Sequence, residues 1–553
     1  MHSFTNTPPG NQTWADMSSL GLPGEHSFLS PRGTHTLHQR AFLFFWLSAL
    51  LLWAVKSLVR ALHLQRHFNK NQEHIKIATV ENGLTANPAK HESNSVPDVT
   101  EKEQVAETEK EHKPATPASD RLPFGTFLKS IALLGAIMFY FYICDYDHFF
   151  PAGTRVYSRD VFVFLYLVLM VVAVCFTTRE CKDKILNRDQ TEEWKGIMQV
   201  LFVWYHYFKA AETYNAIRVF IAAYVWMTGF GNFSFFWIRQ DFSLYRMLKM
   251  LFRLNFLVVI TCIVTTNEYM LYYICPMHTF WFLSVYAMMR PLYKRNADPK
   301  VMAAKFGIYF VLVFLIFDVS GVGEMVFKPF YPILSYRKSL HEWMFRAGLD
   351  HYATFLGMLC AYFYPNFEKF MSSLELEVCD RKTQVTHLLV KFGIAAALVT
   401  SVGFWWCHVF VLPKFDYNKL HPYYSCIPLL AYIYLRNILP SLRTRYIHMF
   451  CWLGRITLET YISQLHVYLQ ADAKMLIVYI PGYPLLNFAL ATVIYLCLSY
   501  TLFHLTVDLS AYLIPKDFKL MGKRLIMGCG WFVGCYLCAA VFLVSKPSTT
   551  SNL

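Results

Sequence analysis

The chain has 553 residues, of which 55% are hydrophobic and only 16% are charged, and its mean hydropathy is +0.32. This composition is typical of a polytopic membrane protein and excludes a soluble enzyme with one large core. The formal net charge is +14, but no compact basic domain is present. We therefore attribute the charge to membrane topology and do not expect nucleic acid as a partner.

The first 122 residues predict an anchored, otherwise unstructured segment. Residues 1–40 are polar, rich in Pro, Gly and Ser, and contain the glycosylation sequon Asn11-Gln-Thr13. Residues 41–61 are apolar, and cations are denser after them than before them. The positive-inside rule therefore predicts a lumenal N-terminus, an anchor helix and a cytosolic segment. Residues 62–122 almost lack aromatic side chains, which predicts a disordered linker.

From residue 123 onward, apolar runs of membrane-spanning length recur. They predict an all-α polytopic bundle over 123–545 with about 14 transmembrane helices, counting the anchor, and a short tail at 546–553. The runs in this bundle lie near residues 127–144, 160–178, 196–211, 214–236, 254–274, 277–291, 303–320, 349–364, 388–412, 423–440, 446–469, 484–507 and 525–545.

A polar stripe marks the third of these runs. Glu192, Lys195, Gln199 and His206 are separated by three, four and seven residues, so they share one face of a helix. An ionisable group at the centre of a bilayer costs about 3 kcal/mol, so this face should avoid lipid. We expect His206 to face a cavity where it could act chemically. The alternative is a histidine that hydrogen-bonds two helices.

A cationic pattern lies between the next two runs. Arg239, Arg246 and Arg253 repeat every seven residues, with Lys249 beside them. Arg218 lies upstream, and we group it with the residues of the polar stripe. Because the guanidinium fork suits phosphate, this pattern favours a phosphate-binding face. The positive-inside rule alone could also explain it.

Residues 323–348 form the largest predicted lumenal loop. Lys338, Glu342, Arg346 and Asp350 are four residues apart, which predicts a ladder of ion pairs on one helix, with His341 beside it. Such a helix is either a solvated interfacial element or a rim that holds an acceptor.

A second polar stripe lies near the C-terminus. Arg455, Glu459, Ser463 and His466 share one face of an apolar helix with Gln470. This row should face a cavity or a partner helix, because lipid would not solvate it. It could serve only to pack helices, or it could bring a second histidine toward the first.

Three weaker signals do not predict sites. Asp145 and His148 mimic the Asp-x-x-His of serine esterases, but no Gly-Asp-Ser block accompanies them, so we interpret this as coincidence. Cys535 and Cys538 lie in an apolar helix without His or acidic neighbours and are interpreted as packing residues. No cluster has the spacing of metal ligands, so we expect no metal.

Several long stretches resemble the polysaccharide O-acetylation family of membrane proteins. That family contains the plant reduced-wall-acetylation proteins, the fungal capsule O-acetylation protein and the animal sialate O-acetyltransferase. The stretches are DQTEEWKGIMQVLFVWYHYF, NAIRVFIAAYVWMTGFGNFSFFWIRQDFSLYRMLKMLFRLNFLV, EYMLYYICPMHT, LHEWMFRAGLDHY and LGRITLETYISQLHVYL. The likeness is greatest to the plant-type members, which lack a lumenal esterase-like domain. The order of His206, Thr228-Gly-Phe230, the arginines and Gly454…His466 also resembles bacterial membrane acyltransferases.

The resemblance implies a Golgi multi-pass O-acetyltransferase that moves acetyl groups from cytosolic acetyl-CoA to lumenal polysaccharide. It implies His206 as general base or acetyl carrier, and Glu459 or His466 as the group that orients or relays a proton. The predicted phosphate ligands are Arg239, Arg246, Lys249 and Arg253. Two alternatives are a carrier for acetyl-CoA and a scaffold that hands acetyl groups to a separate lumenal esterase-fold acetyltransferase.

Overall fold

The computed structural model describes residues 32–83, 123–376 and 380–544, with no side-chain description for 64–83. The predicted disorder of residues 1–31 and 84–122 and the predicted tail at 546–553 therefore lie outside the described residues. Helix α2 (Leu37–Gly83) contains the predicted anchor and extends well into the predicted linker. Residues 62–82 contain no Pro or Gly, so no helix breaker occurs before Gly83.

The rest of the described chain is almost entirely helical, which confirms the all-α prediction. The remaining helices are α3 (Phe124–Phe141), α4 (Arg159–Thr177), α5 (Arg188–Phe208), α6 (Tyr214–Arg239), α7 (Leu244–Thr265), α8 (Ile274–Met289), α9 (Pro299–Phe317), α10 (Val322–Phe327), α11 (Tyr331–Leu334), α12 (His341–Gly348), α13 (Ala353–Ser373), α14 (Arg381–Trp405), α15 (Lys414–Tyr424), α16 (Cys426–Asn437), α17 (Pro440–Arg443), α18 (His448–Arg455), α19 (Thr457–Val467), α20 (Pro484–Leu513) and α21 (Phe518–Val544). The chain forms two compact units, Met1–Gln39 with Ala136–Thr506, and Arg40–Gly135 with Val507–Leu553. The first, which we call the main unit, holds both sites described below.

The predicted count of about fourteen spans is not confirmed. Nine helices within the described ranges are long and apolar enough to cross a membrane, and Ile274–Met289 is a shorter apolar helix. The predicted spans at 196–211, 349–364, 423–440 and 446–469 are largely helical but are not among the nine. Helix α5 is too polar, α16 has only 12 residues, and the last run breaks into α18 and α19 at Ile456.

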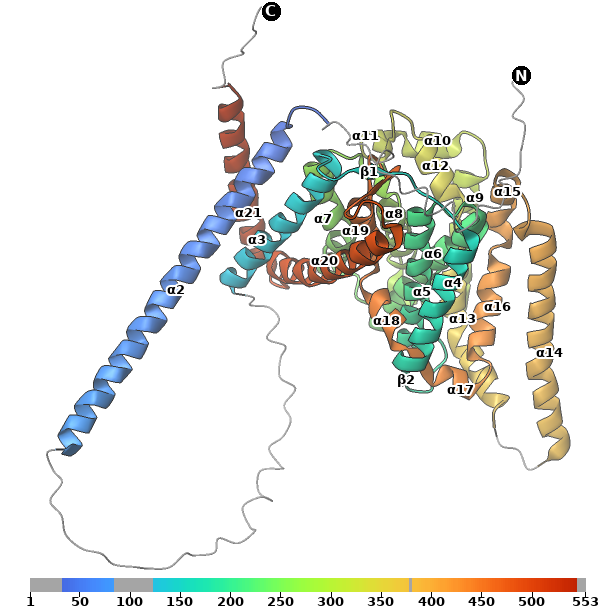
Figure 1. Ribbon diagram of the computed structural model, residues 1–553. Helices are drawn as coiled ribbons and strands as arrows, with labels where there is room; N and C mark the ends of the chain where they lie inside the picture. Colours follow the sequence, from blue (N-terminus) through green and yellow to red (C-terminus); the bar gives the residue numbers. More distant parts are fainter. Residues whose placement is uncertain (1–31, 84–122, 377–379, 545–553) are drawn as a thin grey trace, which may run out of the picture. The chain divides into compact units, whose positions relative to one another are not determined.

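Two small antiparallel sheets mark opposite ends of the main unit (Figure 1). At one end β2 (Thr178–Glu180) pairs with β3 (Arg445–Ile447), close to several exposed arginines and lysines, and we call this the basic end. At the opposite end β5 (Met475–Ile477) lies between β1 (Ala152–Gly153) and β4 (Leu469–Gln470). Each sheet joins segments about 270 to 320 residues apart in sequence and so ties the early helices to α18 and α19.

Two glycines bring α5 and α18 into direct backbone contact. A Cβ atom on Gly196 would lie 1.9 Å from the carbonyl oxygen of Phe450, and one on Gly454 would lie 1.8 Å from that of Glu192. Real Cβ atoms do not approach so closely, so only glycine fits at either position. This contact fixes the start of α19 against the face of α5 that carries Glu192.

A large aromatic core holds α6 against α8 and α13. Trp226, Phe233, Trp281 and Phe282 are fully buried in it. Burying each of these large side chains stabilises the packed helices by on the order of 2–3 kcal/mol. The core leaves the other face of α6 free to line a cavity.

We expect Gly454→Ala to lower the free energy of unfolding by about 3 kcal/mol, because α18 must move away from α5. Gly307→Ala is the matched control. Gly307 lies in α9 with nothing within 4 Å of its Cβ position, so alanine there should be neutral or slightly stabilising. Thermal unfolding of both purified variants in detergent measures the difference, and equal melting temperatures would contradict this role for the α5–α18 contact.

Candidate active site

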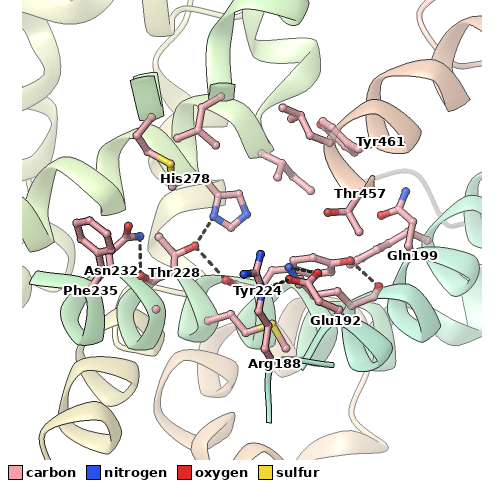
Figure 2. Close-up of a pocket in the computed structure, with 18 of the residues that line it drawn as sticks. Arg188, Glu192, Gln199, Tyr224, Thr228, Asn232, Phe235, His278, Thr457 and Tyr461 are labelled. Atoms are coloured by element: carbon pink, nitrogen blue, oxygen red, sulfur yellow. Dashed lines mark hydrogen bonds and ion pairs between the residues drawn. The ribbon is translucent and has the colours of Figure 1, made fainter. Parts of the chain in front are cut away.

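A cavity of about 650 Å³ lies among α5, α6, α7, α8 and α19 of the main unit (Figure 2). This volume is typical of small-molecule sites in proteins. The cavity is lined by Arg188, Glu192, Lys195, Gln199, Phe202, Tyr224, Met227, Thr228, Gly231, Asn232, Phe235, Arg246, Met250, Leu254, Ile274, His278, Thr457, Leu458 and Tyr461.

Helix α5 supplies most of the charge in this cavity. Its N-terminus is capped by the Asn187 side chain, which accepts a hydrogen bond from the Asp189 backbone N–H at 3.1 Å. Lys195 Nζ lies 2.6 Å from Glu192 Oε2, and Arg188 Nε lies 4.0 Å from the same carboxylate. With Arg246, the lining holds three cations and one carboxylate, so the cavity attracts anions.

Arg246 is the cavity cation that is free to bind a ligand. It lies in the first turn of α7, where Ser243 Oγ accepts its backbone N–H at 3.3 Å. Its guanidinium carbon lies 4.0 Å from the centroid of the Phe235 ring, which holds the group by a cation–π contact. The described residues offer its guanidinium no hydrogen bond or ion pair, and its Nε is buried. A buried, unpaired donor of this kind favours an anionic ligand.

His278, on α8, supplies a base to the same cavity. Its Nδ1 lies 2.7 Å from Thr228 Oγ1, and that hydroxyl also donates to the Tyr224 carbonyl at 3.1 Å. The threonine has one hydroxyl proton. In the tautomer in which that proton goes to the carbonyl, Nδ1–H donates to Oγ1 and Nε2 carries the lone pair, and no described residue hydrogen-bonds to Nε2. Figure 2 shows the imidazole beside Thr228, with this contact drawn as a dashed line.

The sequence did not point to His278 as a site residue. It lies in EYMLYYICPMHT, one of the stretches that carries the family resemblance, but it is a lone polar residue in an apolar helix. A single residue produces no periodicity, so no stripe marked it.

His206 lies away from this cavity. Glu192, Lys195 and Gln199 line the cavity as the stripe predicted, but His206 is seven residues beyond Gln199, or about 10 Å further along α5. Its ring contacts Tyr205 at a centroid distance of 5.1 Å, and its backbone carbonyl accepts from Arg155 Nη1 at 3.4 Å. His206 is thus not among the residues that line the cavity with Arg188, Lys195 and Arg246, and its catalytic role stays a prediction.

The four predicted phosphate ligands do not form one face. Arg239 is the exposed last residue of α6, whereas Arg246 begins α7, and the turn at Gln240 breaks the seven-residue repeat. Lys249 Nζ donates to Tyr245 Oη at 3.3 Å. Of the four, Arg246 alone is among the residues that line the cavity.

Arg253 and Glu459 form a buried ion pair that joins α7 to α19. Arg253 Nη2 donates to Glu459 Oε2 at 2.9 Å, and Thr506 Oγ1 donates to Oε1 at 3.0 Å. The Glu459 side chain is fully buried. Its charge is neutralised and its oxygens are occupied, so the structure gives both residues a bridging position, and their predicted phosphate-binding and proton-relay roles stay predictions.

His466 lies near the opposite end of the main unit, between two polar partners. Its Nε2 is 2.6 Å from Tyr272 Oη, and its Nδ1 is 3.2 Å from Asp145 Oδ2. Asp145 therefore faces His466 and not His148, so its buried position has nothing to do with the esterase-like spacing. Ser463 is buried with an unpartnered Oγ, and half-exposed Arg455 pairs with Asp189 at 3.0 Å.

The predicted ion-pair ladder forms only in part. Helix α12 ends at Gly348, and within it Arg346 Nε donates to Glu342 Oε1 at 2.8 Å. Lys338 precedes the helix with a φ of 62°, and His341 is its exposed first residue. Lys338 and Asp350 lie outside the helix, so the four-residue spacing does not place all four residues on one helix face.

Asp350, the last residue of the predicted ladder, is buried instead of facing an acceptor. Its Oδ2 lies 3.7 Å from Arg218 Nη2, and its Oδ1 lies 3.2 Å from His421 Nε2. These residues come from α6, α15 and the end of the α12 segment. Asp350 thus neutralises Arg218 inside the main unit, as a buried charge requires.

Residues 55–526 match the family described as the 10 TM Acyl Transferase domain found in Cas1p. The chain belongs to this membrane acyltransferase family. It is also 35% identical, over 421 residues, to the N-acetylneuraminate (7)9-O-acetyltransferase of Danio rerio. That match covers 73% of this chain and 53% of the relative, so the chain spans about half the length of the curated relative. No solved structure matches the chain. The predicted family and fold class are confirmed.

Proposed function

We propose that the chain is an O-acetyltransferase that takes acetyl groups from acetyl-CoA and transfers them to hydroxyl groups of a glycan. The observation that carries this proposal is the combination, in one cavity, of the unpaired Arg246 and the free Nε2 of His278. The family supports acyl transfer, and the printed name of the Danio rerio relative supports a sugar acceptor for that relative.

The donor would enter from the basic end. Arg188 is highly exposed at the first residue of α5 and also lines the cavity, so the cavity extends to that end. Coenzyme A carries several phosphates, and Arg188, Lys195 and Arg246 offer cations along the way. The positive-inside rule assigns this end to the cytosol, where acetyl-CoA is supplied. We place the protein in the Golgi membrane, with a lumenal polysaccharide as acceptor.

His278 would act as the general base. Its Nε2 takes the proton of the acceptor hydroxyl as the oxygen attacks the thioester carbonyl, and the C–S bond then breaks. The departing coenzyme A thiolate receives that proton, so no net proton is consumed. Thr228 accepts from Nδ1–H throughout, which fixes the ring and stabilises its charged form. A positioned base contributes about 10²–10⁴-fold to the rate.

Arg246→Gln should weaken acetyl-CoA binding by about ten- to a hundredfold, because a charge-assisted hydrogen bond is worth about 1.5–3 kcal/mol. Arg239→Gln is the matched control. This substitution removes the same charge from the same end, but Arg239 is exposed and lies outside the cavity. Calorimetric titration of both variants with acetyl-CoA measures the effect. If the two variants bind acetyl-CoA equally well, Arg246 does not hold the coenzyme, and its charge contributes only to membrane topology.

His278→Gln should reduce acetyl transfer by about a hundredfold or more while acetyl-CoA binding stays intact, because glutamine cannot accept a proton. The matched variant is His206→Gln, which tests the position predicted from the sequence. We expect it to retain most activity, since His206 lies outside the cavity. A large loss in His206→Gln together with normal turnover in His278→Gln would assign the base to His206.

A further inference from the structure

A second pocket, of about 380 Å³, lies at the opposite end of the main unit. Its lining comes from four separate segments: the segment before α2, the α7–α8 connection, the turn before α12 and the β4–β5 turn. The lining residues are Arg32, Thr266, Asn267, Glu268, Leu271, Tyr336, Arg337 and Asp472. None of them belongs to the cavity described above.

Asp145 holds this pocket together from beneath. Its carboxylate is buried and accepts hydrogen bonds from Arg32 Nη2 at 3.2 Å, Asn267 Nδ2 at 3.0 Å and the Ala471 backbone N–H at 3.1 Å. It also faces His466 Nδ1 at 3.2 Å. One carboxylate therefore fixes three of the four segments that form the pocket, and it acts as a positioning residue.

The pocket is built from strained backbone. Thr266, Arg337 and Asp472 line it with φ values of 58°, 48° and 56°, in the left-handed region that side chains other than glycine rarely adopt. The β-branched Thr266 is the least suited to this conformation. Such strain costs on the order of 1–3 kcal/mol per residue and gathers at functional sites.

The pocket offers hydrogen-bond donors and acceptors that the protein itself does not use. Among the described residues the guanidinium of Arg337 has no hydrogen bond or ion pair, and it stacks over the Tyr336 ring at 5.2 Å. Glu268 accepts one bond, from the Arg337 backbone N–H at 2.8 Å. A carboxylate and a guanidinium with unused hydrogen-bonding capacity beside an aromatic ring match a ligand that has many hydroxyl groups on an apolar ring, which is a carbohydrate.

The linings of the pocket and the first cavity come close to each other along the chain. Leu271 lines the pocket and Ile274 lines the cavity, so these walls are at most about 11 Å apart along the chain. Tyr272, which lies between them in sequence, donates to or accepts from His466 at 2.6 Å. Helix α19 also joins the two sites, because Tyr461 lines the cavity and His466 contacts Asp145.

We propose that this pocket is a carbohydrate subsite that holds the acceptor, opposite the donor cavity. The inference rests on the proposed acetyl transfer and specifies which end of the molecule receives the glycan. Glu268 accepts from sugar hydroxyl groups, Arg337 donates to hydroxyl or carboxylate oxygens, and Asp145, bonded to Asn267, keeps the lining segments in place.

The test uses the full chain in detergent with lactose and sialyllactose as probes, which differ by one carboxylated sugar. We expect Arg337→Gln and Glu268→Gln each to raise the KM for at least one probe, and its Kd without acetyl-CoA, by about tenfold. Acetyl-CoA affinity and kcat should stay unchanged. Lys338→Gln is the matched control, since Lys338 is the exposed neighbouring cation outside the pocket, and it should change KM and Kd less than twofold.

Two outcomes separate this inference from the proposed function. If acetyl transfer occurs but Arg337→Gln and Glu268→Gln behave like Lys338→Gln with both probes, the subsite is overturned and the transferase proposal stands. If the wild-type chain binds a probe in a manner that depends on Arg337 but transfers no acetyl group, the transferase proposal fails and the carbohydrate subsite stands.

Discussion

The backbone contact between α5 and α18 determines where the candidate site forms. Gly196 and Gly454 let the two helices approach until carbonyl oxygens touch α-carbons, and any side chain larger than hydrogen would force them apart. Because Gly454 packs on the Glu192 carbonyl, α19 starts beside the charged face of α5. The cavity is the space that remains between these two helices and the free face of α6, and Figure 2 shows α5 and α19 bounding it.

Charge pairing is the second constraint on this fold. Glu192 with Lys195, Arg253 with Glu459, and Arg218 with Asp350 each neutralise charge inside a bundle that water reaches poorly. Breaking such a pair is costly, because it leaves one buried charge uncompensated. Against this background the unpaired guanidinium of Arg246 stands out, and a ligand anion is the partner that would complete it.

Periodicity explains what the sequence could and could not predict. The stripe on α5 placed Glu192, Lys195 and Gln199 on one face because they share one uninterrupted helix, and that face lines the cavity. The arginine repeat failed because the left-handed residue Gln240 separates two helices, so equal spacing no longer meant a shared face. His278 was missed because it is an isolated polar residue in an apolar helix. The pairing of Asp145 was missed because its partner, His466, lies on a helix distant in sequence.

The measurement that tests the central claim most directly uses the purified chain alone in sealed proteoliposomes. Acetyl-labelled acetyl-CoA is supplied at the basic end and sialyllactose is enclosed at the opposite end. The account predicts labelled acetyl esters on the enclosed sugar, with free coenzyme A appearing only outside. Labelled acetyl-CoA found intact inside, or sugar esters that form only after a second transferase is added, would contradict it and identify a carrier or an acetyl-donor scaffold instead.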